Sequence, residues 1–78
     1  PEGAYVIRVE KNSAAGKAGI QKGDIIVSFD GQTVSGKDDL ESKLAYYASG
    51  ETVDVVVSRA DNGEYVQKTI SVTLGSKN

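Results

Sequence analysis

The chain has 78 residues, 38% of them hydrophobic, with 9 Lys and Arg against 11 Asp and Glu, and it contains no Cys and no His. This length accommodates one small domain, and the missing residue types exclude disulfides, thiolate metal sites and the commonest general base. Because the interleaved charges form no basic stripe and the apolar runs are too short to span a bilayer, we expect no nucleic-acid partner, no direct membrane contact and no cofactor.

The first predicted element is a strand over residues 3–9. Its side chains alternate, with one set on each side of the strand: Tyr5, Ile7 and Val9 on one, and Ala4, Val6 and Arg8 on the other. The small residues of the segment 12–19 predict one helical turn, capped by Asn12 or Ser13 and closed by glycine.

A turn over residues 22–24 leads into a second predicted strand, Ile25–Phe29, which is apolar on both faces at its start and is therefore expected to be central. Asp30-Gly31 is a strong signal for a tight turn. It leads into a short predicted strand over residues 32–34.

A helix is predicted to begin at Ser35, with Asp38 completing a capping box, and to end at Ser49-Gly50. Asp39 and Lys43 form an i, i+4 ion pair in the favourable order. The apolar residues fall at i, i+4 and i+7 and form one stripe: Leu40, Leu44 and Tyr47.

Two further strands are predicted over residues 53–59 and 65–74, joined by a hairpin turn at 61–63. The last strand places four apolar residues on one face, together with the charged Lys68: Val66, Ile70, Val72 and Leu74. Residues 75–78 are predicted to be a tail or linker. The element order predicts an α+β fold, a small antiparallel sheet or partial barrel with one long and one short helix.

No set of catalytic roles can be assembled from these residues, so we expect no catalytic residue and no metal ligand. Asp24, Asp30 and Asp61 lie in glycine-containing turns, where hydrogen bonds to the backbone explain them. The segment 31–37 matches the start of a phosphate-binding loop, but Asp38 replaces the required Ser or Thr. Gly16 to Gly19 matches a nucleic-acid-binding GXXG loop only weakly.

The stripe of Leu40, Leu44 and Tyr47 has two interpretations. It is either part of the core or one wall of a ligand groove. Four Tyr beside one Phe favour some half-exposed contact surface. The residues alone leave both interpretations open.

Several segments of the chain carry one recognisable pattern: residues 3–9, 12–26 and 30–31, the later run from Asp39 to Arg59, and the end at 72–75. Together they resemble a bacterial PDZ domain. The resemblance covers residues 1–74 and is to the PDZ domains of HtrA-like (DegP/DegQ-type) serine proteases. It implies that the chain binds extended peptides or hydrophobic protein C-termini as an added strand between an edge strand and the long helix.

Carried over residue by residue, the resemblance implies that the helix wall of this groove consists of Lys37, Leu40, Glu41, Leu44 and Tyr47. Leu40 and Leu44 would floor an apolar pocket for the terminal side chain, and Tyr47 would border it. Lys37 and Glu41 would lie at its rim.

The resemblance further implies a substrate-recognition or regulatory role in a serine endopeptidase whose catalytic triad lies in a separate domain. That parent is expected to be extracytoplasmic, in the periplasm or membrane-anchored at the cell surface. The alternatives are a PDZ domain of a C-terminal-processing, Lon-like or intramembrane metalloprotease, and a secretion scaffold without a protease. The family's groove strand normally precedes the strand at Gly3, whereas this chain begins at Pro1, so that strand is expected to be missing and peptide binding to be weak.

Overall fold

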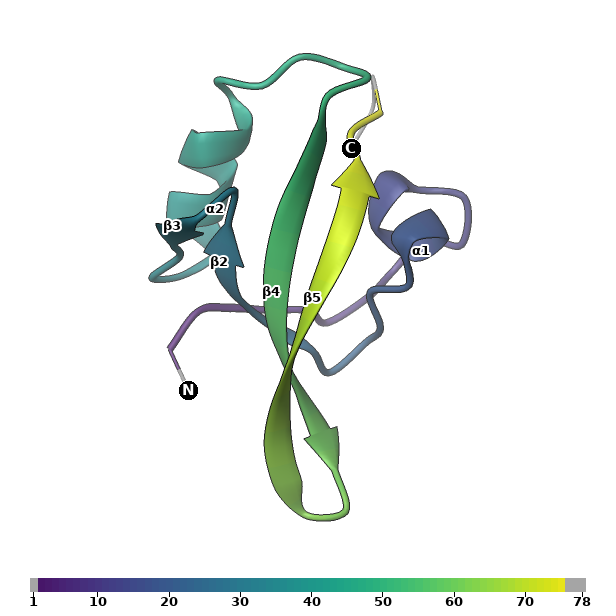
Figure 1. The fold of residues 1–78 in the computed structure, drawn as a ribbon, viewed down its shortest axis with the longest axis vertical. Coiled ribbons are helices and arrows are strands. Elements are labelled where there is room, and N and C mark those ends of the chain that lie inside the picture. Colours follow the sequence, from purple (N-terminus) through teal and green to yellow (C-terminus); the bar gives the residue numbers. More distant parts are fainter. Residues whose placement is uncertain (1, 76–78) are drawn as a thin grey trace.

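An antiparallel sheet of five strands forms the centre of the computed structural model, which describes residues 2–75 (Figure 1). The strand order is β1 (Ala4–Tyr5), β2 (Ile25–Phe29), β4 (Thr52–Asp61) and β5 (Glu64–Thr73), and β3 (Gln32–Thr33) also pairs with β2. Each of these pairings is antiparallel. The predicted α+β class with one short and one long helix is confirmed.

Local turn chemistry sets the register of this sheet. Asp30 and Gly31 have φ of 52° and 78° and join β2 to β3, and Asn62 and Gly63 have φ of 53° and 82° and join β4 to β5. Positive φ at both central residues produces a turn whose twist matches that of the flanking strands. The long hairpin consequently stays in register over its whole length, from Asp61 opposite Glu64 to Thr52 opposite Thr73.

The two helices contact different parts of the sheet: α1 (Ala14–Ala18) contacts β5, and α2 (Lys37–Leu44) contacts β1. Figure 1 shows them on opposite sides of the β4–β5 hairpin. The predicted short helix is confirmed with its caps, because the Ser13 side chain accepts a hydrogen bond from the Gly16 amide and Gly19 closes the helix at φ 100°.

The core lies between the sheet and the helices. One member, Val57 on β4, is completely buried. The other buried members come from most of the chain: Ala4, Ile20, Phe29, Val34, Val53, Val55, Val72 and Leu74. Leu40 and Leu44 of α2 are only half-buried, and they pack against the edge of this cluster.

The first strand is shorter than the predicted range of residues 3–9. Only Ala4–Tyr5 are paired as a strand, and Val6 continues with a hydrogen bond from its amide to the Asp24 carbonyl, 2.8 Å long. Tyr5 and Ile7 are 61% and 70% exposed, whereas Val9 packs against the core. The predicted alternation therefore fails at Val9, because the chain stops pairing and turns towards α1.

The long helix also differs from its predicted bounds. Its N-cap is Gly36 rather than Ser35, and Asp39, not Asp38, caps this end by accepting a hydrogen bond of 2.9 Å from the Ser35 amide. The helix ends at Leu44 instead of at residues 49–50, so Tyr47 lies outside it. The chain leaves the helix early because the Tyr47 ring is held by residues of β2 and the following turn.

In the last predicted strand, the apolar face is buried in the second half but not in the first. Val72 and Leu74 are buried, but Val66 is 40% exposed and Lys68 is also exposed. The reason is that the tip of the hairpin extends past both helices, as Figure 1 shows. Apart from Gly75, the predicted tail over residues 75–78 lies outside the described residues.

Candidate functional site

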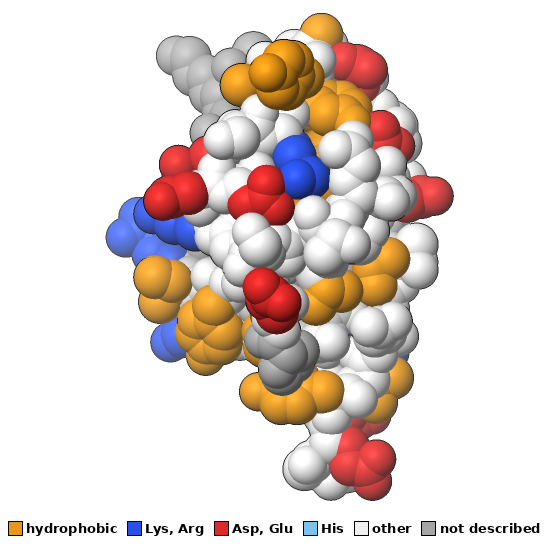
Figure 2. All heavy atoms as spheres, turned by 90° about the vertical axis from the view of Figure 1, so that its left-hand side faces the viewer, with side chains coloured by type: hydrophobic (Ala, Val, Ile, Leu, Met, Phe, Trp, Pro, Cys, Tyr) orange, Lys and Arg blue, Asp and Glu red, His pale blue; other side chains and the backbone are white. Residues whose placement is uncertain are grey.

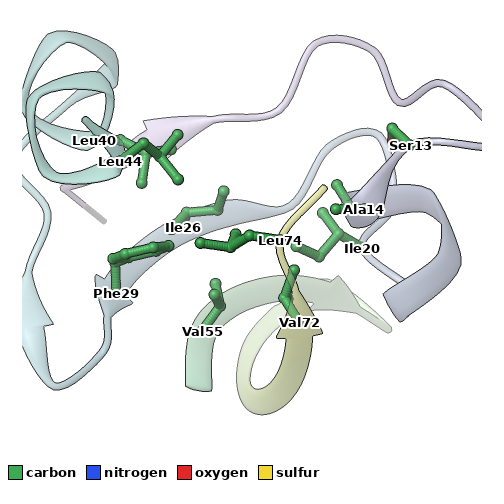
Figure 3. Close-up of a pocket in the computed structure, with 11 residues that line it drawn as sticks. Ser13, Ala14, Ile20, Ile26, Phe29, Leu40, Leu44, Val55, Val72 and Leu74 are labelled. Atoms are coloured by element: carbon green, nitrogen blue, oxygen red, sulfur yellow. The ribbon is translucent and has the colours of Figure 1, made fainter. Parts of the chain in front are cut away.

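The inward side of α2 is the part of the predicted stripe that remains accessible. In Figure 3 the side chains of Leu40 and Leu44 point from α2 towards Ile26, Phe29 and Leu74. An apolar hollow of about 180 Å³ lies among these residues. Its lining comes from both helices and the sheet: Ser13, Ala14, Ala15, Ile20, Ile26, Phe29, Leu40, Leu44, Val55, Val72 and Leu74. The stripe is therefore not sealed inside the core.

A second hollow, of about 350 Å³, opens between β1 and α2. We call the two hollows together the α2 groove, since they share lining residues: Ala15, Ile20, Ile26 and Leu40. The second hollow is lined on its β1 side by residues 4–9 and on its helix side by Lys37 and Leu40. The groove is therefore apolar and bounded by a strand on one side and a helix on the other.

The strand that bounds the groove has a free edge. β1 pairs with β2, with Ala4 opposite Ile26 and Tyr5 opposite Ile25, and no other strand among residues 2–75 pairs with it. Its exposed side chains include Tyr5 and Ile7. An unpaired edge offers backbone donors and acceptors to a further extended chain.

The five predicted site residues, four on α2 and Tyr47 shortly after its end, fall into two groups. Lys37 and Leu40 line the hollow beside β1. Glu41, Leu44 and Tyr47 line a separate hollow at the other end of the helix, next to Leu74 and Gly75. Leu40 and Leu44 also line the inner hollow, so these two residues connect the groups.

Tyr47 is held firmly although it lies outside the helix. Its ring meets the Phe29 ring edge-on, with centroids 5.0 Å apart at 88°. Its hydroxyl donates to Asp30 Oδ2 at 2.6 Å and accepts from Gln32 Nε2 at 3.4 Å. The hydrogen bond to the Asp30 carboxylate raises the pKa of Tyr47. The ring thus fixes the chain after α2 against the β2–β3 turn.

Sequence reasoning assigned only the helix wall of the groove. The strand wall includes Val6, Ile7 and Arg8, and the floor includes Ala15 and Ile20. A usable signal for the strand wall was present, because residues 3–9 are apolar on both sides of the predicted strand. Such a segment has one more apolar side than a single core requires.

A buried ion pair lies outside the groove. Asp24 is 1% exposed, and its two carboxylate oxygens accept hydrogen bonds of 2.9 and 2.7 Å from Arg59. Arg59 also donates to the Gly19 carbonyl, and the Gln21 amide donates to Asp24. Burial opposes ionisation, but the hydrogen bonds from Arg59 and Gln21 outweigh it and lower the pKa of Asp24.

This cluster has a structural explanation. It joins the end of α1, the start of β2 and the strand β4, so the prediction of Asp24 as a turn residue describes only part of its role. Within residues 2–75, Asp, Glu, His and Cys side chains form no cluster of three or more that could hold a metal ion. No helix in this part of the chain is long and apolar enough to cross a membrane.

Comparison with known proteins places these features in a family. The PDZ domain family matches residues 1–74. A "Probable periplasmic serine endoprotease DegP-like" of Brucella suis biovar 1 (strain 1330) is 36% identical over 76 residues, which are 97% of this chain and 15% of that protein. A "Serine protease Do-like HtrA" of Lactobacillus helveticus is 37% identical over 70 residues, 90% of this chain and 16% of that protein.

The fold is also found in a solved structure, "HtrA-type protease AlgW with decapeptide". The two structures agree with a TM-score of 0.69 at 28% identity, over 92% of this chain and 22% of the protease chain. The chain therefore spans about one sixth of the length of the curated relatives named above.

Proposed function

This chain belongs to the PDZ domain family and is related to the PDZ domains of HtrA-type serine proteases, and from this premise we propose that it captures extended peptides or hydrophobic protein C-termini. The bound segment lies in the α2 groove, with its backbone along the free edge of β1. Its apolar side chains rest on Leu40 and Leu44. Lys37, Leu40 and Leu44 form the helix wall of this groove, and Glu41 and Tyr47 extend it at the far end of α2 through the neighbouring hollow.

The observation that carries this proposal is the open apolar groove beside an unpaired strand edge. Main-chain hydrogen bonds along such an edge provide affinity, and neighbouring pockets select side chains. Leu40 and Leu44 are half-buried and accessible from the inner hollow, so apolar area remains to be removed from water. The similar protease in the comparison was solved with a decapeptide, which supports a peptide as ligand.

The role within the parent protein follows from the relatives. They are named as serine proteases, and one of them as periplasmic. We therefore propose that this domain recognises substrates or regulates proteolysis in an extracytoplasmic, membrane-anchored serine endopeptidase. Peptide bonds would be cleaved by a separate domain of that protein, not by this one.

Titration with a labelled peptide that ends in a hydrophobic residue tests the binding proposal. We expect measurable affinity for the 78-residue chain. Failure to bind would contradict the proposal.

A polar substitution in the groove tests where the peptide lies. Leu44→Ser is expected to weaken binding about tenfold, since partial burial of a Leu side chain is worth about 1.5 kcal/mol. Val66→Ser is the matched control, because Val66 is 40% exposed on the hairpin tip and outside the groove. Thermal unfolding of both variants separates lost binding from lost folding.

An unfolded protein substrate tests the division of labour. The chain alone is expected to release no fragments from it, whereas the full-length parent protein is expected to degrade it. Proteolysis by the 78-residue chain would overturn this part of the proposal.

A further inference from the structure

The strand β5 has an unpaired edge of its own, at the end of the sheet opposite β1. The strand order is β1, β2, β4 and β5, so among residues 2–75 no strand pairs with the outer side of β5. The short helix α1 contacts β5 and lines a hollow together with Val72 and Leu74, in the C-terminal half of this region. The N-terminal half extends past both helices (Figure 1), and every residue from Glu64 to Thr69 is exposed. This half of the edge is therefore open to another chain.

The backbone of β5 directs hydrogen-bonding groups outwards at alternate residues. The Leu74 amide donates to the Glu51 carbonyl at 2.8 Å, and the pairing of β4 with β5 continues from there to the turn without a shift in register. Because hydrogen-bonded pairs alternate with non-bonded pairs in an antiparallel ladder, the even-numbered residues of β5 bond to β4. The amides and carbonyls of Tyr65, Gln67 and Thr69 consequently face the free edge.

The tip of the hairpin carries acidic and basic side chains close together along β5. Glu64 lies directly opposite Asp61, so two like charges are neighbours at the end of the hairpin. Figure 2 shows acidic side chains there, at the lower end of the molecule. Lys68 is exposed one turn of the pleat pattern further along, on the same face as Glu64. Neither Glu64 nor Lys68 forms an ion pair with any of residues 2–75, so both charges are free to meet a second chain.

We propose that this edge joins a second copy of the chain, with the two β5 strands antiparallel and Val66 of one copy opposite Val66 of the other. Glu64 of each copy then lies opposite Lys68 of the second copy. Tyr65 lies opposite Gln67 of the second copy, and their outward backbone groups exchange hydrogen bonds. A twofold contact uses the same surface of both copies, so each of these pairs occurs twice.

Charge selects this register from its neighbours. Opposite charges on facing residues stabilise a pair of strands, whereas like charges directly opposite destabilise it. A register centred on Lys68 would place two lysines opposite each other, and one centred on Gln67 would place Glu64 opposite Ile70 and leave the charges unmatched. A lysine on an exposed edge normally discourages pairing, but in the register centred on Val66 it meets an acid.

The contact leaves the α2 groove of each copy open. Residues 64–68 line none of the hollows that form or adjoin the groove, and β1 and β5 lie at opposite ends of the strand order. Two joined copies therefore present two grooves. Linked sites bind a ligand with two suitable segments more tightly than either site alone.

A single cysteine tests the register, because the chain contains no Cys of its own. Val66→Cys places two thiols opposite each other at a non-hydrogen-bonded pair, where the Cα atoms are about 4.5 Å apart, a separation that a disulfide spans. Tyr65→Cys and Gln67→Cys are the matched controls, since in this register their own counterparts lie diagonally, about 7–8 Å away. In a glutathione redox buffer, the Val66→Cys chain is expected to form a disulfide-linked dimer at least about tenfold faster than either control.

Charge exchange in the Val66→Cys background provides the second arm. Glu64→Lys and Lys68→Glu each place like charges opposite each other, and each is expected to slow dimer formation about three- to tenfold at low salt. The double variant Glu64→Lys/Lys68→Glu restores opposite charges in the same register and is expected to recover the original rate. Lys22→Glu, in an exposed turn before β2, is the control for a change in net charge and is expected to leave the rate unchanged.

The unaltered chain provides the third measurement. A contact of this size belongs to the weak, transient interfaces, so we expect a dissociation constant of about 0.1–1 mM by sedimentation equilibrium. A chain that remains monomeric at several millimolar would overturn the proposal, as would a Val66→Cys chain that cross-links no faster than its two controls. Association without recovery in the double variant would place the joint elsewhere, such as at the edge of β1, and would also overturn it.

Peptide capture and this contact fail separately. Saturation of the 78-residue chain with the labelled hydrophobic peptide is expected to leave the cross-linking rate of Val66→Cys unchanged, because the groove lies outside the joint. Inhibition of cross-linking by the peptide would show that the second copy occupies the groove itself, which would contradict the assignment to β5. Cross-linking by a chain that binds no peptide would support the contact and count against the proposed function alone.

Discussion

The two sides of this small domain are completed to different degrees. On one side, Asp24, Arg59 and the Gly19 carbonyl form a buried hydrogen-bonded cluster that joins α1, β2 and β4. On the other side, β1 has an unpaired edge and α2 presents half-buried leucines to an open groove. We call these the closed side and the open side.

The difference shows how a domain of this size can combine stability with binding. A domain of 78 residues buries a limited fraction of its surface and has little stability to spare. Buried polar groups that are fully satisfied fix the relative positions of the elements on the closed side. Apolar area left uncovered on the open side is then available to a ligand.

Removal of the buried carboxylate is expected to have the largest effect on stability. Asp24→Ala removes the carboxylate that pairs with Arg59 and leaves the guanidinium only its bond to the Gly19 carbonyl, and breaking a buried ion pair in this way costs about 3–5 kcal/mol. In a urea titration, most molecules of the Asp24→Ala variant are expected to be unfolded even without urea. Asp54→Ala, at an exposed position on the neighbouring strand, is the control and is expected to change stability by less than about 0.5 kcal/mol. Similar losses in the two variants would mean that the Asp24–Arg59 pair is not the main stabilising contact of the closed side.

A methyl group at Gly16 is the next largest perturbation. A Cβ atom there would lie 2.3 Å from the Glu10 carbonyl oxygen and 2.8 Å from that of Lys11, so Gly16→Ala must displace backbone. Overpacking of this kind costs about 1–3 kcal/mol. Gly36→Ala on the open side meets no atom within 4 Å, and it is expected to cost well under 1 kcal/mol by urea unfolding. The reverse ranking would mean that the open side is the more tightly packed.

The acid dependence of stability should also distinguish the sides. The pKa of Asp24 is lowered in the folded chain, so its contribution to stability is complete above the ordinary carboxyl pKa of about 3.9. That contribution is lost as the pH falls through the lower folded-state pKa. The pKa of Asp39 is lowered too, mainly by a hydrogen bond from Lys43, but Lys43 and Asp39 form a more accessible pair on α2.

Urea unfolding between pH 2 and pH 7 measures this dependence. Below pH 4, the free energy of unfolding is expected to depend less on pH in Asp24→Asn than in Asp39→Asn. The reason is that screening by salt weakens the more accessible pair, Asp39 with Lys43. A larger effect from Asp39→Asn would contradict the assignment of the main acid-sensitive contact to the closed side.

The sequence predicted those parts of the fold that are encoded by neighbouring residues. The cap at Ser13, the turn at Asp30-Gly31 and the turn at Asn62-Gly63 each depend on a few adjacent positions. The helix end was mispredicted because Tyr47 is held by Phe29 and Asp30, which are distant in sequence. Gly50, predicted as the helix stop, has a φ of 93° and donates its amide to Leu74 in a later turn.

For the candidate site, as for the fold, the sequence indicated the part that is encoded by neighbouring residues. Its helix wall lies on one continuous segment, so periodicity and family resemblance together indicated Lys37, Leu40 and Leu44. The strand wall and floor come from two other segments, and tertiary contacts bring them together. The same limitation applies to the ion pair of Asp24 with Arg59, whose members are 35 positions apart.

The smallest expected effect tests whether the open side was left incompletely stabilised at the start of α2. Gly36, the N-cap, has an extended backbone and no side chain to bond the first amides of the helix. Gly36→Ser supplies a capping oxygen and is expected to raise the free energy of unfolding by a few tenths of a kcal/mol, whereas Gly36→Ala is expected to lower it slightly. If urea unfolding instead shows that Ser destabilises the chain as Ala does, the extended conformation at Gly36 requires glycine itself. The start of α2 would then be as tightly constrained as the closed side.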